Sequence, residues 1–257
     1  MENYAPSLED PPGFIVRTEI EKAAAARGYR LPRGSEGAWF AYDSTTADGR
    51  IWLASVGPDG PWFLALDHSG VVAEIGSSDA LPGPGLARYA FGTKSDLYDR
   101  LDQVWRLSAS LPSIPLREFQ LQTAALSRST EAERWVMQRV GQSVFRAALM
   151  KYWNGRCPLT GITAPELLRA SHIVAWVDCD DDAHRLDVHN GLLLSALWDA
   201  AFDKGLISFS DLGEILYSTA LNDNARLHFR PSINFLGGLT DGHRVNLLRH
   251  RRAFGFE

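Results

Sequence analysis

The sequence is poor in features that mark several classes of protein. It has only two cysteines, Cys157 and Cys179, in 257 residues. Two cysteines exclude a four-cysteine zinc site and favour a pair of reduced thiols. No apolar run approaches the ~20 residues that span a bilayer. The first residues, MENYAPSLEDPP, are acidic and proline-rich, unlike a secretory signal. These absences predict a cytoplasmic protein with no membrane association.

An excess of positive charge is also missing. The formal net charge is −5, which does not by itself indicate a nucleic-acid binder. The charge is unevenly distributed, because residues 1–127 carry net −5 and residues 128–257 carry net zero. Five acids of the second half crowd between residues 178 and 187, which leaves the rest of that half basic. Any main DNA-contacting surface is therefore expected in the second half.

Short apolar runs separated by turn residues fill the region from Gly37 to Gly76. The runs GAWFAYDS, RIWLASVG, PWFLALDHS and GVVAEIG are separated by TTADG, PDG and HSG. This pattern is typical of an antiparallel meander. Helical patterns at Glu19–Arg27 and Lys94–Ser108 flank it. We therefore predict a small α+β domain over residues 1–112, with an antiparallel sheet and helices.

Three tryptophans in this meander allow two interpretations. Trp39, Trp52 and Trp62 lie on runs whose alternation could place them inside or outside the sheet. Aromatic side chains inside would form a core. Outside, they could stack on a flipped, modified base and make this domain the reader of modified DNA. We recognise no enzyme motif in this half of the chain.

A second domain is predicted over residues 113–257. The segment Leu111–Leu116 contains two prolines and has the pattern of a linker. The segment Arg128–Trp153 that follows has a long helical pattern. Thr130 precedes Glu133 by three residues, which is the spacing of a capping box at a helix start.

Side chains suited to catalysis follow in a fixed order after this helix. His172 closes the run LLRASH, and Asn190 heads the apolar run GLLLSAL, which has the pattern of a buried strand. The next segment, Ala196–Lys204, has the pattern of a short helix that ends at Gly205. Positions i and i+4 share one face of a helix, so Asp199 and Asp203 can point at one ion. Oxygen ligands of this kind favour Mg²⁺ or Mn²⁺ over Zn²⁺.

In this order the segment resembles the HNH (ββα-metal) nuclease family, in particular the branch found in restriction-type endonucleases. The resemblance covers roughly residues 130–220, and the order of the fragments is more specific than any one of them. The fragments are Cys157-Pro158-Leu159-Thr160-Gly161, Ala170-Ser171-His172-Ile173, Asn190-Gly191-Leu192-Leu193-Leu194 and Phe202-Asp203-Lys204-Gly205-Leu206-Ile207.

The resemblance implies a role for each matching residue. His172 would be the general base that activates water, and Asn190 would hold the loop and orient the His172 ring. Asp199 and Asp203 would hold a divalent metal against the scissile phosphate. Many members have Asp or His where Ser171 stands, as a metal ligand, and His where Asp199 stands. We therefore place Ser171 with the metal ligands, although a hydroxyl is a poorer ligand than a carboxylate.

These features together predict a C-terminal HNH domain that acts as a metal-dependent DNA endonuclease, a hydrolase of phosphodiester bonds. Arg156, Arg169 and Lys204 are candidates for contacts with DNA phosphates. The expected partner is DNA, and a double-strand cut would require a homodimer, because one such site cuts one strand. A restriction enzyme, including one that requires modified bases, is the leading role. A mobile-element nuclease and a catalytically degenerate DNA-binding module remain open.

Overall fold

Two compact units divide the chain. The computed structural model describes residue 8 and residues 10–256, apart from 77, 80, 128 and 234. Unit 1 ends at Ala109 and unit 2 begins at Ser110, whereas the boundary predicted from the sequence lies at residue 112. Both units contain helices and antiparallel strands, so the predicted α+β class is confirmed. No helix within the described residues is long and apolar enough to cross a bilayer.

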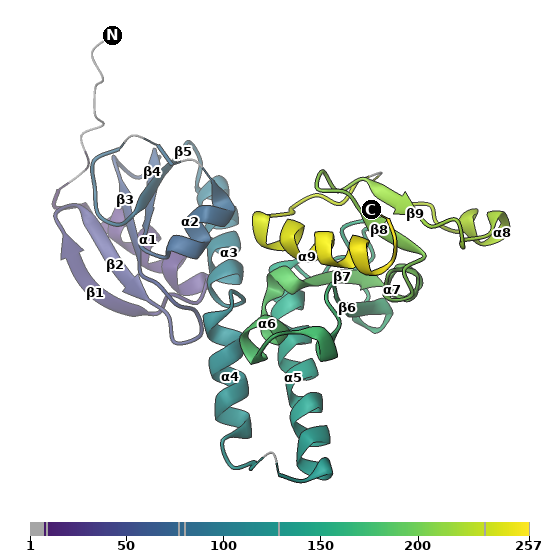
Figure 1. Ribbon diagram of the computed structural model, residues 1–257. Coiled ribbons are helices and arrows are strands. Elements are labelled where there is room, and N and C mark those ends of the chain that lie inside the picture. The colour runs from purple at the N-terminus through teal and green to yellow at the C-terminus, as the bar shows by residue number, and fades with distance from the viewer. Residues whose placement is uncertain are drawn as a thin grey trace. The chain divides into compact units, whose positions relative to one another are not determined.

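Unit 1 is built on a five-stranded antiparallel sheet in which each strand pairs with the next along the chain (Figure 1). The strands are β1 (Leu31–Glu36), β2 (Trp39–Asp43), β3 (Ile51–Ser55), β4 (Trp62–Leu66) and β5 (Ala87–Phe91). The helices are α1 (Phe14–Ala26), α2 (Ser69–Ile75) and α3 (Lys94–Ser108). Every residue of β3 and β4 is buried, as expected when both faces of a central strand are covered.

The three tryptophans of the meander lie in the core of unit 1. Trp39, Trp52 and Trp62 are 5%, 6% and 1% exposed. Trp39 and Trp52 belong to a buried cluster with Phe63 on one sheet face, and Leu81 packs against that cluster. These rings are therefore covered by the protein itself and do not form an exposed stacking platform.

Two segments of the chain differ from the sequence interpretation. The run at residues 70–76 belongs to helix α2 (Ser69–Ile75) and its C-cap and not to a strand, because the His68 side chain accepts a hydrogen bond from Val71 N at 3.3 Å and caps a helical turn. The predicted linker Leu111–Leu116 contains the start of helix α4, Ser113–Thr123. Pro115 is accommodated there because a proline in the first turn of a helix gives up no helical hydrogen bond.

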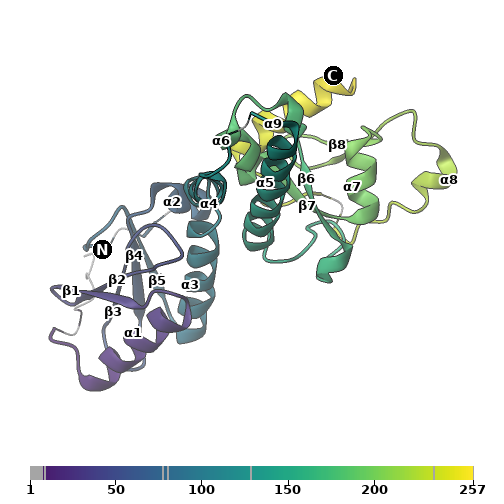
Figure 2. The ribbon, with the colours of Figure 1, turned by 90° about the horizontal axis from the view of Figure 1, so that it is seen from below.

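Unit 2 places a ββα arrangement against a long helix (Figures 1 and 2). Helix α5 (Glu131–Tyr152) starts at the expected capping box of Thr130 and Glu133. Strand β6 (Leu168–His172) pairs antiparallel with β7 (Gly191–Ser195), and α7 (Ala196–Asp203) follows directly. Helix α7 ends before Gly205, which has φ 63°, a conformation that favours glycine.

Short elements connect these parts of unit 2 and complete it. Between β6 and β7 run the turn η2 (Trp176–Asp178), helix α6 (Asp182–Leu186) and the turn η3 (Val188–Asn190). The remaining elements are the turn η1 (Pro165–Leu167), strands β8 (Ile207–Phe209) and β9 (Ile215–Tyr217), and helices α8 (Asp223–Arg226) and α9 (Asp241–Ala253). Helix α9 packs on β8 and on η3, so it covers the connection that leads into β7.

Candidate functional site

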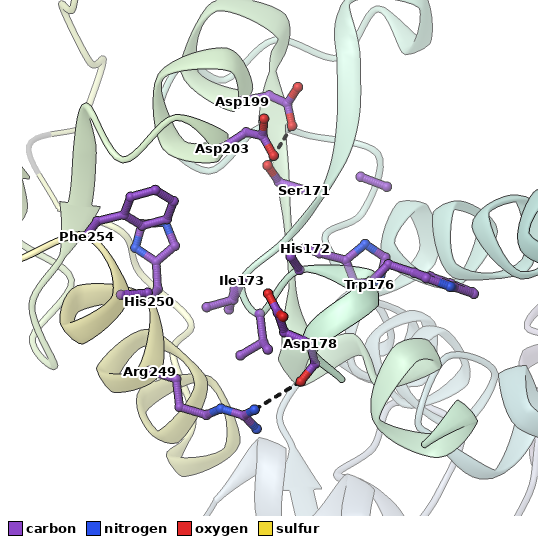
Figure 3. A pocket seen from close by; sticks show the side chains of 14 residues that line it. Ser171, His172, Ile173, Trp176, Asp178, Asp199, Asp203, Arg249, His250 and Phe254 are labelled. Carbon is purple, nitrogen blue, oxygen red and sulfur yellow. Dashed lines mark hydrogen bonds between the residues drawn. The ribbon is translucent and has the colours of Figure 1, made fainter. Parts of the chain in front are cut away.

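Strand β6 sends two adjacent side chains in opposite directions, as the pleat of a strand requires. The hydroxyl of Ser171 donates a 2.6 Å hydrogen bond to Oδ1 of Asp199 on α7. The ring of His172 stacks on Phe145 of α5, with ring centroids 3.8 Å apart and an interplanar angle of 17°. Figure 3 shows Ser171 beside the two aspartates and His172 beside Trp176. Strand β6 therefore contributes Ser171 to the side of the site that holds the two aspartates, and the His172 imidazole to the side that faces α5.

The imidazole of His172 is fixed in one tautomer. Its Nε2 lies 2.9 Å from the carbonyl oxygen of Arg185 on α6. A carbonyl only accepts hydrogen bonds, so Nε2 carries the proton and Nδ1 keeps a lone pair. Within the described residues Nδ1 forms no hydrogen bond. A neutral imidazole with an unoccupied acceptor nitrogen can take a proton from water.

The surroundings of His172 keep it neutral. The pKa of His172 is lowered to about 4, mainly because burial disfavours the imidazolium and to a smaller extent because of the nearby His184. The Arg185 carbonyl acts in the opposite direction. The edge of Trp176 closes another side of the ring, with centroids 5.6 Å apart. His172 is therefore in its basic form at neutral pH.

Helix α7 carries both aspartates. Asp199 lies in the first turn of α7, where the helix dipole favours a carboxylate, and Ser171 is its only hydrogen-bond partner within the described residues. Asp203 lies one turn later, is exposed, and pairs with Lys204 at 3.0 Å. The i, i+4 spacing expected from the sequence is thus present on one helix.

A cavity of about 500 Å³ connects these groups. Its lining includes Ser171, His172, Asp199 and Asp203, and on the opposite side Arg249 and His250 of α9 (Figure 3). His250 is a structural residue, because its Nδ1 lies 3.0 Å from the Ser208 hydroxyl and its Nε2 lies 3.1 Å from the Phe202 carbonyl. Arg249 donates to the Asp178 carbonyl and pairs with Asp180, so it ties α9 to the η2 segment.

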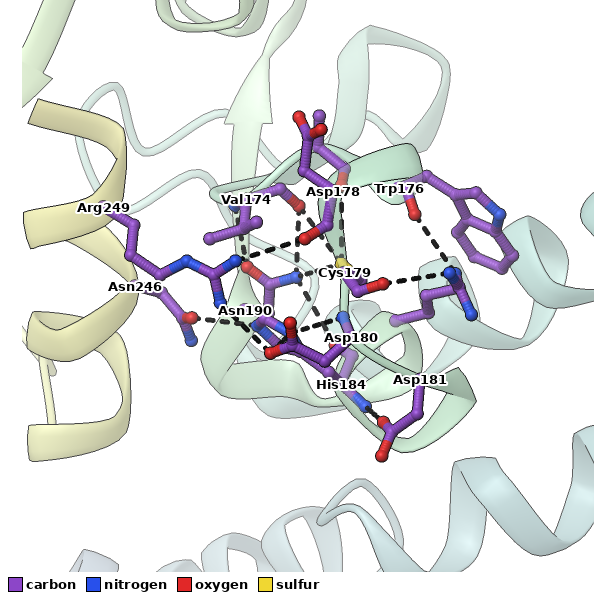
Figure 4. A network of polar contacts seen from close by, with 12 residues as sticks. Val174, Trp176, Asp178, Cys179, Asp180, Asp181, His184, Asn190, Asn246 and Arg249 are labelled. Atoms are coloured by element: carbon purple, nitrogen blue, oxygen red, sulfur yellow. Dashed lines mark hydrogen bonds and ion pairs between the residues drawn. The ribbon is translucent and has the colours of Figure 1, made fainter. Parts of the chain in front are cut away.

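Asn190 holds the loop between the two strands. Its Oδ1 accepts from Val174 N at 2.8 Å, and its Nδ2 donates to the Val174 carbonyl, to Cys179 Sγ and to the His184 carbonyl (Figure 4). Asn190 is fully buried, so these bonds satisfy its amide. The His172 ring is held by the Arg185 carbonyl and not by Asn190, which corrects that part of the expected role.

The predicted phosphate contacts lie outside the lining of the cavity. Arg156 donates to the Gly161 carbonyl at 3.0 Å, and Arg169 donates to the carbonyls of Glu166 and Leu168. Lys204 pairs with Asp203. The two arginines therefore stabilise turns of the backbone in this structure, and Lys204 is the nearest of the three to a predicted metal ligand.

Hard oxygen ligands are present at the site in limited number. Within the described ranges, no group of three or more His, Cys, Asp or Glu side chains is arranged to hold a metal ion. Asp199 and Asp203 supply two carboxylates, and the Ser171 hydroxyl is directed at one of them. Such a set fits Mg²⁺ or Mn²⁺, which keep several waters and use one or two carboxylates with substrate phosphate. Zinc sites in proteins are typically richer in histidine and cysteine ligands. Both cysteines are buried and free.

Sequence reasoning did not identify Arg185 or Arg249. Arg185 lies in the acidic loop, and Arg249 lies in the basic C-terminal helix. Both segments contain many charged residues, so no single position has a distinct pattern. The contact of Arg185 with His172 uses its backbone carbonyl, an atom that every residue type has. Only the fold reveals such a contact.

Comparison with known proteins adds an independent finding. A search of curated proteins finds no match to this chain. A scan of protein families matches residues 157–210 to the HNH endonuclease family, a range that includes β6, β7 and α7 with all the cavity residues of the ββα arrangement. Members of this family generally use a divalent metal, and the match indicates a nuclease that acts on DNA. Residues 157–210 of this chain are thus assigned to an HNH endonuclease domain.

Proposed function

We propose that the protein is a DNA endonuclease that hydrolyses phosphodiester bonds with His172 as general base and a divalent metal at Asp199 and Asp203. The observation that carries the proposal is the state of His172. Its tautomer is fixed by the Arg185 carbonyl, its pKa is lowered to about 4, and it lines the same cavity as both aspartates. A neutral imidazole and two carboxylates that line one cavity are groups that hydrolysis of a phosphodiester can use.

Each residue has a separate task in this mechanism. Nδ1 of His172 would accept the proton of the attacking water, and the Arg185 carbonyl would stabilise the imidazolium through the Nε2 proton. Asp199 and Asp203 would hold the metal, which when bound supplies positive charge to stabilise the leaving oxygen. The sequence places Ser171 with the metal ligands, and its bond to Asp199 supports a role in holding that carboxylate in place.

Magnesium or manganese is the proposed cofactor. The two carboxylates provide part of a coordination shell, and water and a phosphate oxygen would complete it. With so few protein ligands, the metal would bind weakly to the free protein and more tightly together with DNA. Arg156, Arg169 and Lys204 are the proposed phosphate contacts, and for the two arginines this would require exchanging a backbone carbonyl for a phosphate.

The biological role that best suits this arrangement is a restriction-type enzyme, with unit 1 as the reader of DNA. Trp39, Trp52 and Trp62 are buried, so recognition of a modified base by unit 1 would use other residues. A double-strand cut would require two copies of the site and thus a homodimer.

Cleavage of plasmid DNA in Mg²⁺ or Mn²⁺ tests the proposal. We expect nicking or linearisation that EDTA abolishes and that His172→Ala removes. Matched plasmids with and without modified bases would test the restriction role, and the ratio of nicked to linear product would test the need for two sites. Binding of DNA without cleavage in any of these metals would instead identify a degenerate HNH module, an outcome that the small number of protein ligands keeps open.

A further inference from the structure

Arg185 contacts the neighbourhood of His172 in two ways. Its backbone carbonyl accepts the Nε2 proton of His172 at 2.9 Å. Its guanidinium turns toward the preceding loop, where Nε donates to the Trp176 carbonyl at 3.1 Å and Nη2 donates to the Cys179 carbonyl at 3.0 Å. One residue therefore joins the proposed base to both ends of the η2 turn.

The guanidinium of Arg185 is itself held in place. Its Nη1 pairs with Asp182 at 3.1 Å, one turn earlier on α6, and its side chain is only 23% exposed. The planar group thus makes three bonds in three directions, which a guanidinium can do and an ammonium on a flexible stem cannot do with the same geometry. Helix α6 has five residues, and this cross-link joins it to η2 alongside the bonds of Asn190 to Cys179 Sγ and to the His184 carbonyl.

Trp176 is the part of the η2 turn that touches His172. Its indole edge packs on the imidazole, with centroids 5.6 Å apart, and the Arg185 guanidinium lies 5.9 Å from the indole centroid. Gly141 of α5 makes room for the indole, because a Cβ there would lie 2.3 Å from the Trp176 ring. Figure 4 shows Trp176 and Cys179 at the two ends of the turn.

The imidazole of His172 is therefore confined on three sides. Phe145 covers one face, Trp176 closes one edge and the Arg185 carbonyl fixes Nε2. Phe145 belongs to the long helix α5, which is anchored by its own hydrogen bonds. The other two sides belong to short segments, η2 and α6, and the Arg185 side chain ties these two segments together.

We propose that Arg185 is a positioning residue for His172: its guanidinium locks the turn 176–179 to α6, so that the Arg185 carbonyl and Trp176 hold the imidazole in the Nε2-protonated tautomer. This inference rests on the proposed function for its catalytic consequence, because the free acceptor at Nδ1 affects cleavage only if His172 is the base. Arg185 makes no contact with a reacting atom and acts entirely through His172.

Two substitutions separate charge from geometry at this position. Arg185→Lys keeps the positive charge and the pair with Asp182 but cannot bond both loop carbonyls in the observed arrangement. Arg185→Ala removes all three bonds. Arg244→Lys is a matched control, because Arg244 also donates to one backbone carbonyl, that of Asp211, and pairs with an aspartate three residues earlier, Asp241.

The direct measurement is the tautomer of His172 by long-range ¹H–¹⁵N NMR on histidine-labelled protein, with His172→Gln to assign the signal. We expect a pure Nε2-protonated form in the unsubstituted protein and in Arg244→Lys. In Arg185→Lys and Arg185→Ala we expect a mixture of the two neutral tautomers. A pure Nε2-protonated signal in both Arg185 variants would overturn the proposal. This NMR measurement does not require the protein to cleave DNA.

Cleavage kinetics provide the second measurement. We expect kcat of Arg185→Lys to fall by about 10-fold to 100-fold, as small displacements of catalytic groups do, while KM for DNA stays close to that of Arg244→Lys. A kcat equal to that of the control would overturn the proposal even if stability were reduced. If the unsubstituted protein does not cleave DNA, the proposed function fails, and the tautomer measurement alone decides the role of Arg185. If Arg185→Ala does not fold, Arg185→Lys decides it.

Discussion

The hydroxyl of Ser171 donates to Oδ1 of Asp199 across 2.6 Å, and this bond replaces a direct ligand at the position before the proposed base. In the resemblance that the sequence suggests, an acid or histidine often stands at position 171 and binds metal. Here the side chain holds the neighbouring carboxylate instead. Ser171 is 4% exposed, so its hydroxyl has little access to water, and losing the bond to Asp199 would leave a buried polar group unsatisfied.

Ser171→Ala is expected to raise the Mg²⁺ concentration that cleavage requires, although both carboxylate ligands remain. A hydrogen bond to a charged group contributes about 1.5–3 kcal/mol, so losing the bond that orders Asp199 should raise the Mg²⁺ concentration for half-maximal cleavage by roughly tenfold or more. The measurement is cleavage rate against Mg²⁺ concentration. Ser208→Ala is the control, because it also removes a buried strand hydroxyl and should lower stability with no change in the Mg²⁺ curve. An unchanged curve for Ser171→Ala would remove the assigned role.

His172→Ala is expected to lower the cleavage rate by about 10²-fold to 10⁴-fold, the usual contribution of a general base. DNA binding should remain, because the ring faces Phe145 and the Arg185 carbonyl. His172→Gln is a useful companion, since its amide can still donate to that carbonyl but cannot accept a proton from water. Both variants should be equally inactive, whereas the melting temperature of His172→Gln should be closer than that of His172→Ala to the value of the unsubstituted protein. Activity retained in the Gln variant would assign the proton transfer to another group.

Local patterns predicted the elements that depend on neighbouring residues. The helix Lys94–Ser108 was expected from its apolar spacing, and the structure confirms those bounds, with Thr93 accepting from Asp96 N at its start. The capping box of Thr130 and Glu133 is likewise confirmed. Both signals act within four residues, so the sequence contains all of the relevant contacts.

Contacts between distant residues could not be predicted in this way. Ser171 and Asp199 are 28 residues apart, and His172 and Arg185 are 13 apart. The resemblance predicted which residues would carry the chemistry, but it did not show that His172 and Ser171 point to opposite faces of β6. The misassigned strand at residues 70–76 has another cause: its valines favour strands, and the cap supplied by His68 favours a helix.

Stability should fall as the solution becomes mildly acidic. His243 and His250 of α9 are buried, and burial lowers the pKa of His243 to about 3 and that of His250 to about 4. Unfolded histidine has a pKa of about 6.5. Between the folded and unfolded values the unfolded chain binds more protons, so the free energy of unfolding decreases as pH falls below about 6.5. Above that pH these histidines should add no pH dependence.

Urea denaturation from pH 8 to pH 4.5 checks this expectation. We expect a plateau at high pH and a decline through the window from about 6.5 downward. His243→Gln should reduce the slope by nearly one proton, because glutamine does not titrate and its amide oxygen can still accept from Thr240 N, as Nδ1 of His243 does. A slope unchanged by His243→Gln would show that this residue does not account for the acid sensitivity.

Gly141→Ala should have two opposing effects on stability, at a position that packs against Trp176 beside His172. In a helix interior alanine is favoured over glycine by about 1 kcal/mol, so local propensity predicts stabilisation. The new Cβ would, however, lie 2.3 Å from the Trp176 ring, which packs against His172. Overpacking costs about 1–3 kcal/mol, so the clash should win, lowering both the melting temperature and kcat. Gln142→Ala, on the exposed side of the same helix, should change neither by much. If Gly141→Ala were stabilised and fully active, Trp176 could shift without consequence. That result would contradict the idea that the η2 turn positions His172.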